Sequence, residues 1–279
     1  MKLKRILSAL LCAGMLTCAL TACGTDKPAT TSDQPTSGAE SAAAAGDLAY
    51  IQGKGKLVIG ITDFAPMDYQ DASGAWIGFD ADLAKAFAES IGVKAEFVVI
   101  DWDSKIMELE GKTIDCVWNG MTLTDDVTAA MACSKPYCNN QQIVIVKKDV
   151  ADQYKTAEDC KDLSFAVENS SAGMEQAEAN GFAYTPVVDQ ATALMEVAAG
   201  TSDAAIIDSL MAGAMVGEGT SYEQLAYTVG LNDEQYGVGF RKGSDLAEKL
   251  NEFFKTSYDS GKMQEIAKTY GVQAALIAQ

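Results

Sequence analysis

Short apolar runs alternate along the chain with segments in which apolar residues recur every four positions. A continuous apolar run is typical of a strand covered on both faces, and the sequence has such runs at 57–61, 97–100, 143–146 and 204–207. Helical periodicity is clearest at 79–91 and 246–258, and the glycines that soon follow, Gly92 and Gly261, predict the helix ends. The alternation predicts an α/β fold with largely parallel sheets.

Two segments of the chain, 113–119 and 201–208, resemble each other. Each has the pattern of a helix end, a short turn and an apolar strand that finishes on a polar side chain, Asn119 in the first and Asp208 in the second. Ligands of doubly wound sheets bind beyond the carboxyl ends of the strands, so these two side chains are expected where two lobes face one ligand. The similarity alone is also what any two helix–strand units would show.

The N-terminus has the pattern of an export signal. Two lysines and an arginine precede an apolar run at 6–20, which is too short to span a bilayer. The run ends in Leu20-Thr21-Ala22-Cys23, which resembles the lipobox of bacterial lipoproteins. That resemblance implies a signal peptide at 1–22 and a diacylglyceryl group on Cys23 after cleavage. An ordinary secretory signal with an incidental cysteine is the alternative.

A polar segment follows the signal. Residues 23–46 are rich in Ser, Thr, Ala, Pro and Gly and have no apolar periodicity, so they cannot bury enough surface to offset the entropy of ordering. We expect a flexible tether there, with the folded part starting near Asp47. Two acyl chains hold a protein on a membrane where one is marginal, which predicts an extracytoplasmic protein anchored to the cell membrane.

Composition excludes several classes of function. The chain has 279 residues, 48% of them apolar, and 39 acidic against 21 basic residues, a formal charge of -18 that argues against nucleic acid as a partner. Histidine is absent, which removes imidazole-based triads and His-ligated metals. Only Arg5 and Arg241 could make bidentate contacts to an anion. We expect no metal and no cofactor, and an enzyme of this composition would have to work with carboxylates, lysine, tyrosine or cysteine.

Four cysteines remain outside the signal and the lipid site: Cys116, Cys133, Cys138 and Cys160. They lack CxxC spacing and histidine neighbours, so a zinc site is not expected. An exported location permits a disulfide. The alternative is a set of small buried thiols, which suits Cys116 inside the apolar run 114–118. For Cys133 with Cys138 both interpretations stay open.

Seven short motifs follow one another from about residue 54 to the C-terminus: Gly55-Lys-Leu-Val-Ile-Gly60, Phe64-Ala-Pro-Met, Gly78-Phe-Asp-Ala-Asp-Leu-Ala84, Asp101-Trp102-Asp103, Asn119-Gly-Met-Thr-Leu-Thr124, Ser134-Lys-Pro-Tyr137 and Gly237-Val-Gly-Phe-Arg241. Their order and spacing resemble the family 3 extracellular solute-binding proteins of ABC importers, the polar amino-acid type. The resemblance implies a two-lobed, type II periplasmic-binding-protein-like fold, in which a two-strand hinge joins two mostly parallel sheets flanked by helices.

The same resemblance implies how the chain is divided and what it does. Residues 47–144 and 236–279 would form lobe 1, and residues 145–235 would form lobe 2. A small solute would bind in the cleft, and the closed form would be presented to a permease that works with an ATPase. No bond is made or broken, and a monomer is expected.

The ligand contacts implied by the resemblance come from both lobes. Phe64 and Trp102 would sandwich the solute, and Asp208 would accept its ammonium. The remaining contacts are backbone and hydroxyl groups at strand and helix ends: Asn119, Gly120, Thr122, Ser170, Ser171 and Ala172. Structural roles are the alternative for several: a core aromatic at Trp102, a turn at Gly120, a helix N-cap at the serines and a solvated charge at Asp208.

One departure from the family pattern concerns the ligand's carboxylate. The family usually has an arginine at the position of Val127. Helix-end N–H groups or a lysine such as Lys135 would have to replace it, or the solute lacks a free α-carboxylate. Glu168 adds negative charge beside the cleft unless it faces water, which favours an amine-bearing solute.

These observations leave three function classes. The first is a lipid-anchored substrate-binding component of an ABC transporter that captures an amino acid or a related small amine-bearing solute. The second is a solute receptor for a separate signalling partner. The third is a dehydratase on the same fold, which would depend on Glu168, Asp208 or a lysine because histidine is absent.

Overall fold

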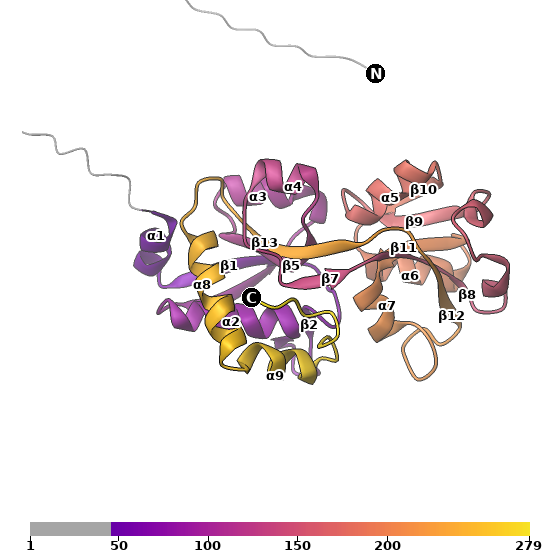
Figure 1. Ribbon diagram of the computed structural model, residues 1–279. Helices are drawn as coiled ribbons and strands as arrows, with labels where there is room; N and C mark the ends of the chain where they lie inside the picture. Colours follow the sequence, from indigo (N-terminus) through magenta and orange to yellow (C-terminus); the bar gives the residue numbers. More distant parts are fainter. Residues whose placement is uncertain (1–45) are drawn as a thin grey trace, which may run out of the picture. The chain divides into compact units, whose positions relative to one another are not determined.

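Two separate sheets carry the fold, in a computed structural model that describes residues 46–279 (Figure 1). The predicted signal peptide at 1–22, the lipidation of Cys23 and all but the last residue of the tether lie outside the described residues. The first described helix, α1, spans Asp47–Lys54. No helix within 46–279 combines the length and apolar character needed to cross a lipid bilayer.

The first sheet has the strand order β4-β1-β5-β13-β6, and β7 also pairs with β13. Its strands are β1 Lys56–Ile61, β4 Lys94–Val99, β5 Cys116–Thr122, β6 Ala132–Cys133, β7 Cys138–Asn140 and β13 Glu234–Phe240; a two-stranded ribbon of β2 Tyr69–Gln70 and β3 Trp76–Ile77 accompanies it. The helices associated with this part are α1, α2 Phe79–Ser90, α3 Lys105–Glu110, α4 Asp125–Ala130, α8 Leu246–Asp259, α9 Lys262–Thr269 and the 3-10 turn η1 Trp102–Ser104.

The second sheet has the order β10-β9-β11-β8-β12. Its strands are β8 Gln142–Lys147, β9 Ser164–Glu168, β10 Ala183–Val187, β11 Ala204–Asp208 and β12 Leu225–Gly230. Its helical elements are α5 Ala172–Asn180, α6 Gln190–Ala199, α7 Ser209–Met215 and the 3-10 turns η2 Ala151–Gln153 and η3 Glu158–Cys160.

The chain passes between the sheets twice, from β7 to β8 and from β12 to β13 (Figure 1). β1 is parallel to β4 and β5, and β9 is parallel to β10 and β11, whereas β8 and β13 run antiparallel to their neighbours. The α/β prediction is confirmed. Each sheet is mixed rather than mostly parallel, because the strands that follow the two connections enter from the opposite direction.

The predicted strands and helices are observed. The four apolar runs lie in β1, β4, β8 and β11, and the two periodic segments lie in α2 and α8. β4 differs in its burial, because Ala95 and Phe97 pack against the core while the alternate residues Lys94, Glu96 and Val98 are exposed. One face of this edge strand is therefore open, and the expected cover on both faces is wrong for 97–100.

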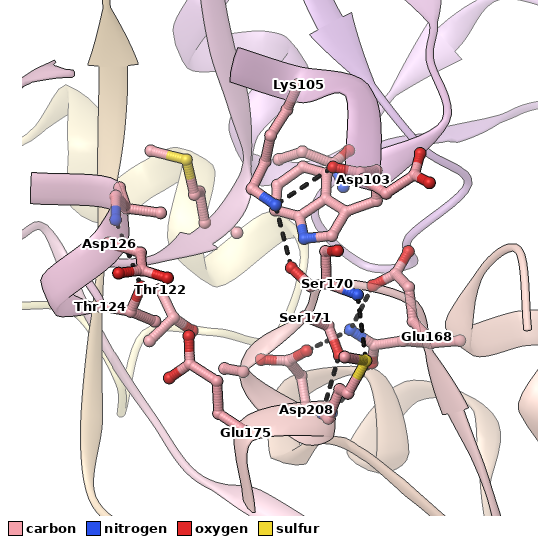
Figure 2. Close-up of a pocket in the computed structure, with 18 of the residues that line it drawn as sticks. Asp103, Lys105, Thr122, Thr124, Asp126, Glu168, Ser170, Ser171, Glu175 and Asp208 are labelled. Atoms are coloured by element: carbon pink, nitrogen blue, oxygen red, sulfur yellow. Dashed lines mark hydrogen bonds between the residues drawn. The ribbon is translucent and has the colours of Figure 1, made fainter. Parts of the chain in front are cut away.

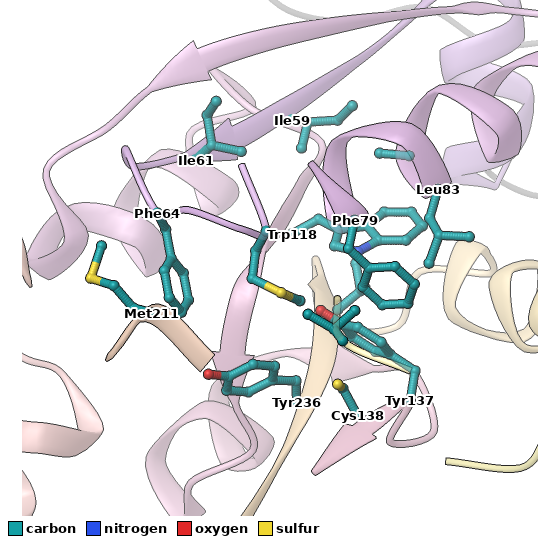
Figure 3. Close-up of a cluster of buried hydrophobic side chains, with 14 of the residues drawn as sticks. Ile59, Ile61, Phe64, Phe79, Leu83, Trp118, Tyr137, Cys138, Met211 and Tyr236 are labelled. Carbon is teal, nitrogen blue, oxygen red and sulfur yellow. The ribbon is translucent and has the colours of Figure 1, made fainter. Parts of the chain in front are cut away.

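Aromatic packing joins the C-terminal helices to the first sheet. Trp118 of β5 lies between Phe87 of α2 and Phe254 of α8, with ring centroids 6.2 and 5.6 Å away. The buried cluster continues through Tyr137 and Tyr236 and includes Met211 of α7 (Figure 3). It is these long-range contacts that bring residues beyond 240 back to the first sheet.

The four cysteines of the described region are free thiols. Cys116, Cys138 and Cys160 are buried, and Cys133 is half-buried. The structure therefore agrees with the buried-thiol interpretation for Cys116 and contains no Cys133–Cys138 bridge in the region 46–279.

Candidate ligand-binding site

A cavity of about 310 Å³ is lined by residues that extend from both sheets (Figure 2). All nine residues that the sequence indicated as ligand contacts line it: Phe64, Trp102, Asn119, Gly120, Thr122, Ser170, Ser171, Ala172 and Asp208. Phe64, which follows β1 of the first sheet, and Asp208, at the end of β11 in the second, therefore face one space. The contacts of these residues with a ligand remain a prediction.

Asn119 reaches the cavity from inside a strand. The polar atoms of its side chain bind Thr62 on the end of β1: Oδ1 accepts from Thr62 N at 2.9 Å, and Nδ2 donates to Thr62 Oγ1 at 2.8 Å. β5 continues to Thr122, so the expectation that the strand finishes at Asn119 is wrong by three residues. Because these bonds occupy its amide, Asn119 fixes β1 against β5.

Gly120 lets the Phe64 ring lie against bare backbone. Its φ is +53°, and a Cβ built there would overlap the edge of the Phe64 ring. Its N–H donates to Asp80 Oδ2 at 2.6 Å, so the amide is not left for a ligand. Phe64 itself is 3% exposed and makes an edge-on contact with Tyr236, with ring centroids 6.3 Å apart. Gly120 thus lies inside β5 with a left-handed backbone, not in a turn, and forms part of the cavity wall.

On the second sheet, the chain leaves β9 through a tight turn and enters α5. Ser170 adopts a left-handed conformation with φ +55°. The Ser171 hydroxyl accepts from Met174 N at 3.1 Å, so this serine is the N-cap of α5. The first-turn N–H groups of a helix have no acceptor within the helix, and Ser171 and Ala172, where these groups begin, line the cavity.

Glu168, at the end of β9, lines the cavity and is 4% exposed, so the alternative that it faces water is wrong. Its Oε1 atom has no hydrogen-bond partner among residues 46–279. Burial, together with the charge of Asp208, raises the pKa of Glu168 to about 8. A donor or a cation in the cavity would satisfy this oxygen.

Asp208 is the last residue of β11 and is also 4% exposed. The alternative that Asp208 is a solvent-exposed loop charge is therefore wrong. Its Oδ1 accepts from Tyr236 Oη at 2.6 Å, from Gln142 Nε2 at 3.0 Å and from Asn140, and its Oδ2 accepts from Gln190. Burial and the charge of Glu234 raise the pKa of Asp208 to about 8.

Several lining residues were not anticipated from the sequence. They are Lys105, Gln190 and four acids, Asp103, Asp126, Glu175 and Glu178. Lys105 stands at the start of α3, and its Nζ donates to Trp102 O at 3.1 Å and to Ser170 O at 2.9 Å (Figure 2). A signal existed: Lys105 precedes Leu109 by four positions, so it lies on the buried face of that short helix.

The structure tests whether Lys135 can take the place of the arginine that the family usually has at position 127. Val127 lines the cavity and is 4% exposed. Lys135 does not line it, and its backbone N–H donates to Asn251 Oδ1 at 2.8 Å on α8. The suggestion that Lys135 replaces the arginine is therefore wrong.

Charge in the cavity is strongly one-sided. Its lining has six carboxyl groups and one ammonium, that of Lys105, within the described chain. No group of three or more His, Cys, Asp or Glu side chains within 46–279 is arranged to hold a metal ion. The arrangement is suited to a cation that brings its own charge and hydrogen-bond donors.

The sequence is similar to bacterial binding proteins over most of its length. ArtP, the arginine-binding extracellular protein of Bacillus subtilis (strain 168), is 28% identical over 267 residues, which cover 94% of this chain and 96% of that protein. The L-cystine-binding protein TcyJ of Escherichia coli (strain K12) is 27% identical over 230 residues, covering 81% of this chain and 86% of that protein.

Solved structures of binding proteins are also similar to this chain over most of its length. A substrate-binding protein of an ABC uptake transporter from Streptococcus pneumoniae with bound histidine has a TM-score of 0.75 and 31% identity, over 83% of this chain and 98% of that one. A mutant of ArgBP from T. maritima has a TM-score of 0.74 and 30% identity, over 80% of this chain and 98% of that one.

The model of the bacterial extracellular solute-binding proteins, family 3, matches residues 57–273, which include both sheets and every described residue predicted to contact ligand. The chain belongs to this family of extracellular solute-binding proteins.

Proposed function

We propose that this protein is the substrate-binding component of an ABC importer and that it captures an amino acid or a related small amine-bearing solute. The observation that carries the proposal is the pair of buried carboxyl groups, Glu168 and Asp208, in the cavity wall. The relatives support the solute class, because those named above bind arginine, cystine and histidine.

The two carboxyl groups suit an ammonium for a physical reason. A buried carboxylate is costly unless a cation and hydrogen-bond donors accompany it. An ammonium supplies one positive charge and three N–H donors. Glu168 Oε1 is free to accept one of these, and Asp208 lines the same space.

The aromatic side chains would hold the rest of the solute. Phe64 and Trp102 both line the cavity and are mostly buried. Flat apolar rings stabilise methylene groups and can also hold a cation over the ring face. We expect the solute to lie between these rings, with its ammonium toward Asp208.

Two lobes are proposed to close on the solute: 47–144 with 236–279, and 145–235. The two connections between the sheets would form the hinge. Hydrogen bonds join the walls of the cavity, from Lys105 Nζ to Ser170 O and from Asn169 Nδ2 to Asp103 Oδ2 at 3.0 Å. Such bonds would form only when the lobes are together.

Membership of an extracellular family implies that the protein works outside the cytoplasm. We propose in addition that cleavage after residue 22 exposes Cys23 for lipidation, so that the protein stays on the membrane and delivers its solute to a permease and ATPase. The full chain expressed in a bacterial host should incorporate labelled palmitate, and Cys23→Ala should not. Equal labelling of the two would contradict the anchor.

Binding is tested by calorimetry and thermal denaturation with L-arginine, L-histidine, L-cystine and a polyamine. Ligand at about 100 times Kd should stabilise the protein by about 2.7 kcal/mol. Asp208→Asn should weaken the best ligand by about tenfold to a hundredfold. The control is Asp162→Asn, an exposed site with the same charge change. No response to any of these compounds, or equal affinities of Asp208→Asn and wild type, would contradict the proposal.

A second candidate, an enzyme, has one observation in its favour. An ancestral amino acid-binding protein described as a precursor of cyclohexadienyl dehydratase is 32% identical with a TM-score of 0.72, over 81% of this chain and 99% of that one. Here Glu168 would have to supply the acid or base. Turnover of a small carboxylic acid by wild type that is lost in Glu168→Gln would favour this function.

A further inference from the structure

Lys105 is the one Lys or Arg side chain that lines the cavity in the part of the chain that the structure describes. It is 6% exposed, which is rare for a lysine. Its ammonium is held in place by Trp102 O and Ser170 O, at 3.1 and 2.9 Å, and it lies 4.8 Å from the centroid of the Trp102 ring. The position of this charge is therefore fixed from two sides.

The ammonium of Lys105 retains one donor. A lysine has three N–H groups, and two of them are used by the carbonyls. Figure 2 shows the Lys105 ammonium beside Ser170, with Glu168 and Asp208 on one side and Asp126 and Glu175 on another. The third donor is available to a group in the cavity.

An anionic group could enter this cavity at few places. The other charged side chains in its lining are carboxyl groups, which repel an anion. Val127, which also lines it, is apolar. Next to Ser170, the first turn of α5 adds the N–H of Ala172, whereas that of Ser171 donates to Glu168 O at 3.3 Å. Positive potential is thus concentrated where Lys105 meets the start of α5.

We propose that Lys105 binds the carboxylate of the solute and selects amino acids over amines that lack one. This assignment rests on the proposed function and narrows the solute class to compounds with both a free carboxylate and an ammonium. A charge-assisted hydrogen bond of this kind corresponds to about a tenfold to hundredfold difference in Kd.

The test uses pairs of compounds that differ by the carboxylate alone: L-arginine and agmatine, L-lysine and 1,5-diaminopentane, L-histidine and histamine. Calorimetry measures both Kd values of each pair for wild type, Lys105→Met, Lys105→Gln and Lys105→Arg. Gln keeps N–H donors for the two carbonyls but loses the charge, so it covers the case in which Met does not fold. Lys94→Met, at an exposed lysine of β4, is the control.

Wild type, the control and Lys105→Arg should bind the amino acid of a pair at least about tenfold more tightly than the amine. In Lys105→Gln and Lys105→Met the two affinities should converge, with the amine bound as well as before or better. A merely structural role would weaken both compounds equally and leave their ratio intact, which would overturn the assignment. Equal binding of both compounds by wild type would overturn it while the proposed function stands. Binding of none of the six would overturn the assignment, and if L-cystine and the polyamine do not bind either, the proposed function is overturned as well.

Discussion

Asp208 and Glu234 accept hydrogen bonds from the same two side-chain amides. Gln142 Nε2 is 3.0 Å from Asp208 Oδ1 and 2.8 Å from Glu234 Oε1, and Asn140 Nδ2 donates to the same two oxygens. Asn140 and Gln142 flank the first connection between the sheets, and Glu234 begins β13 after the second. The carboxyl group that lines the cavity is therefore tied to both connections.

This arrangement makes solute binding depend on pH. The pKa values of Asp208 and Glu168 are raised to about 8, mainly by burial, so both groups hold protons at lower pH. A cation in the cavity favours their ionised forms, so binding should release protons. Affinity for L-arginine, whose guanidinium stays charged, should rise by up to about tenfold per pH unit per proton below about pH 8 and then level off.

Calorimetry at several pH values, in two buffers of different ionisation enthalpy, measures the protons released directly. A binding enthalpy that does not depend on the buffer, with a Kd that is constant with pH, would contradict this coupling.

Glu234→Gln should move the pH profile of binding. The charge of Glu234 is the second cause, after burial, of the raised pKa of Asp208. Without that charge, Asp208 should ionise at lower pH, and the rise in affinity should occur at lower pH too. The same calorimetric series checks this, with Asp233→Asn, an exposed acid next to Glu234, as control. A profile identical to wild type would show that Glu234 does not act on Asp208.

Gly120→Ala should impair both folding and binding. The added Cβ would overlap the Phe64 ring, and the residue would have to keep a φ of +53°. We expect a loss of about 1–3 kcal/mol in unfolding free energy and a weaker Kd for the solute, because Phe64 must shift. Urea denaturation and calorimetry measure the two effects. Gly213→Ala, where a Cβ meets open space inside α7, should cost nothing.

The stability of the protein should fall as pH rises, because Asp68 and Asp80, like Glu168 and Asp208, are buried acids with raised pKa values. Asp68 and Asp80 are fully buried, and neither carboxylate oxygen of Asp68 has a partner in the described region. Burial raises the pKa of Asp80 to about 6, and burial with the charge of Asp80 raises the pKa of Asp68 well above its usual value. The folded state therefore holds protons that the unfolded chain releases above about pH 4.

The sign follows from linkage: when the native state binds more protons than the unfolded state, the free energy of unfolding decreases with pH, by about 1.4 kcal/mol per unit for each proton. Asp68→Asn removes one of these titrating groups and should reduce the slope by up to about 1.4 kcal/mol per unit in urea denaturation between about pH 5 and pH 8, while the other three acids keep their contributions. Asp71→Asn, at an exposed turn, should keep the wild-type slope. Parallel slopes for all three proteins would disprove the role of Asp68.

Arg241→Met should destabilise the fold by about 3 kcal/mol. The guanidinium contacts Asp47 at 3.1 Å and Asp115 at 3.5 Å, and it donates to Ile114 O at 2.9 Å. Removing it leaves Asp115, which is fully buried, with Lys54 as its remaining cation. Thermal denaturation measures the loss.

The matched control for Arg241 is Lys249→Met, which breaks an exposed pair with Glu252 and should cost no more than about 1 kcal/mol. Similar melting temperatures for the two variants would mean that the Arg241 cluster contributes little.

The sequence alone determined the local structure and the family. Continuous apolar runs and the four-residue period placed β1, β8, β11, α2 and α8, because burial of one face imposes a period that can be seen in any single segment. The resemblance to the family indicated nine residues, and the structure brings all nine to one cavity. The resemblance succeeds here because strand ends in such sheets lie at one edge.

Tertiary structure decided which charges meet. Lys105 lines the cavity, whereas the backbone of Lys135 is hydrogen-bonded to α8. The local sequence around each lysine does not distinguish these two positions. Asp208 shares its donors with Glu234 only because two connections bring β8 and β13 together. Linear spacing records the period of each element but not the contacts between distant elements, and it is these contacts that set burial, pKa and the charge of the site.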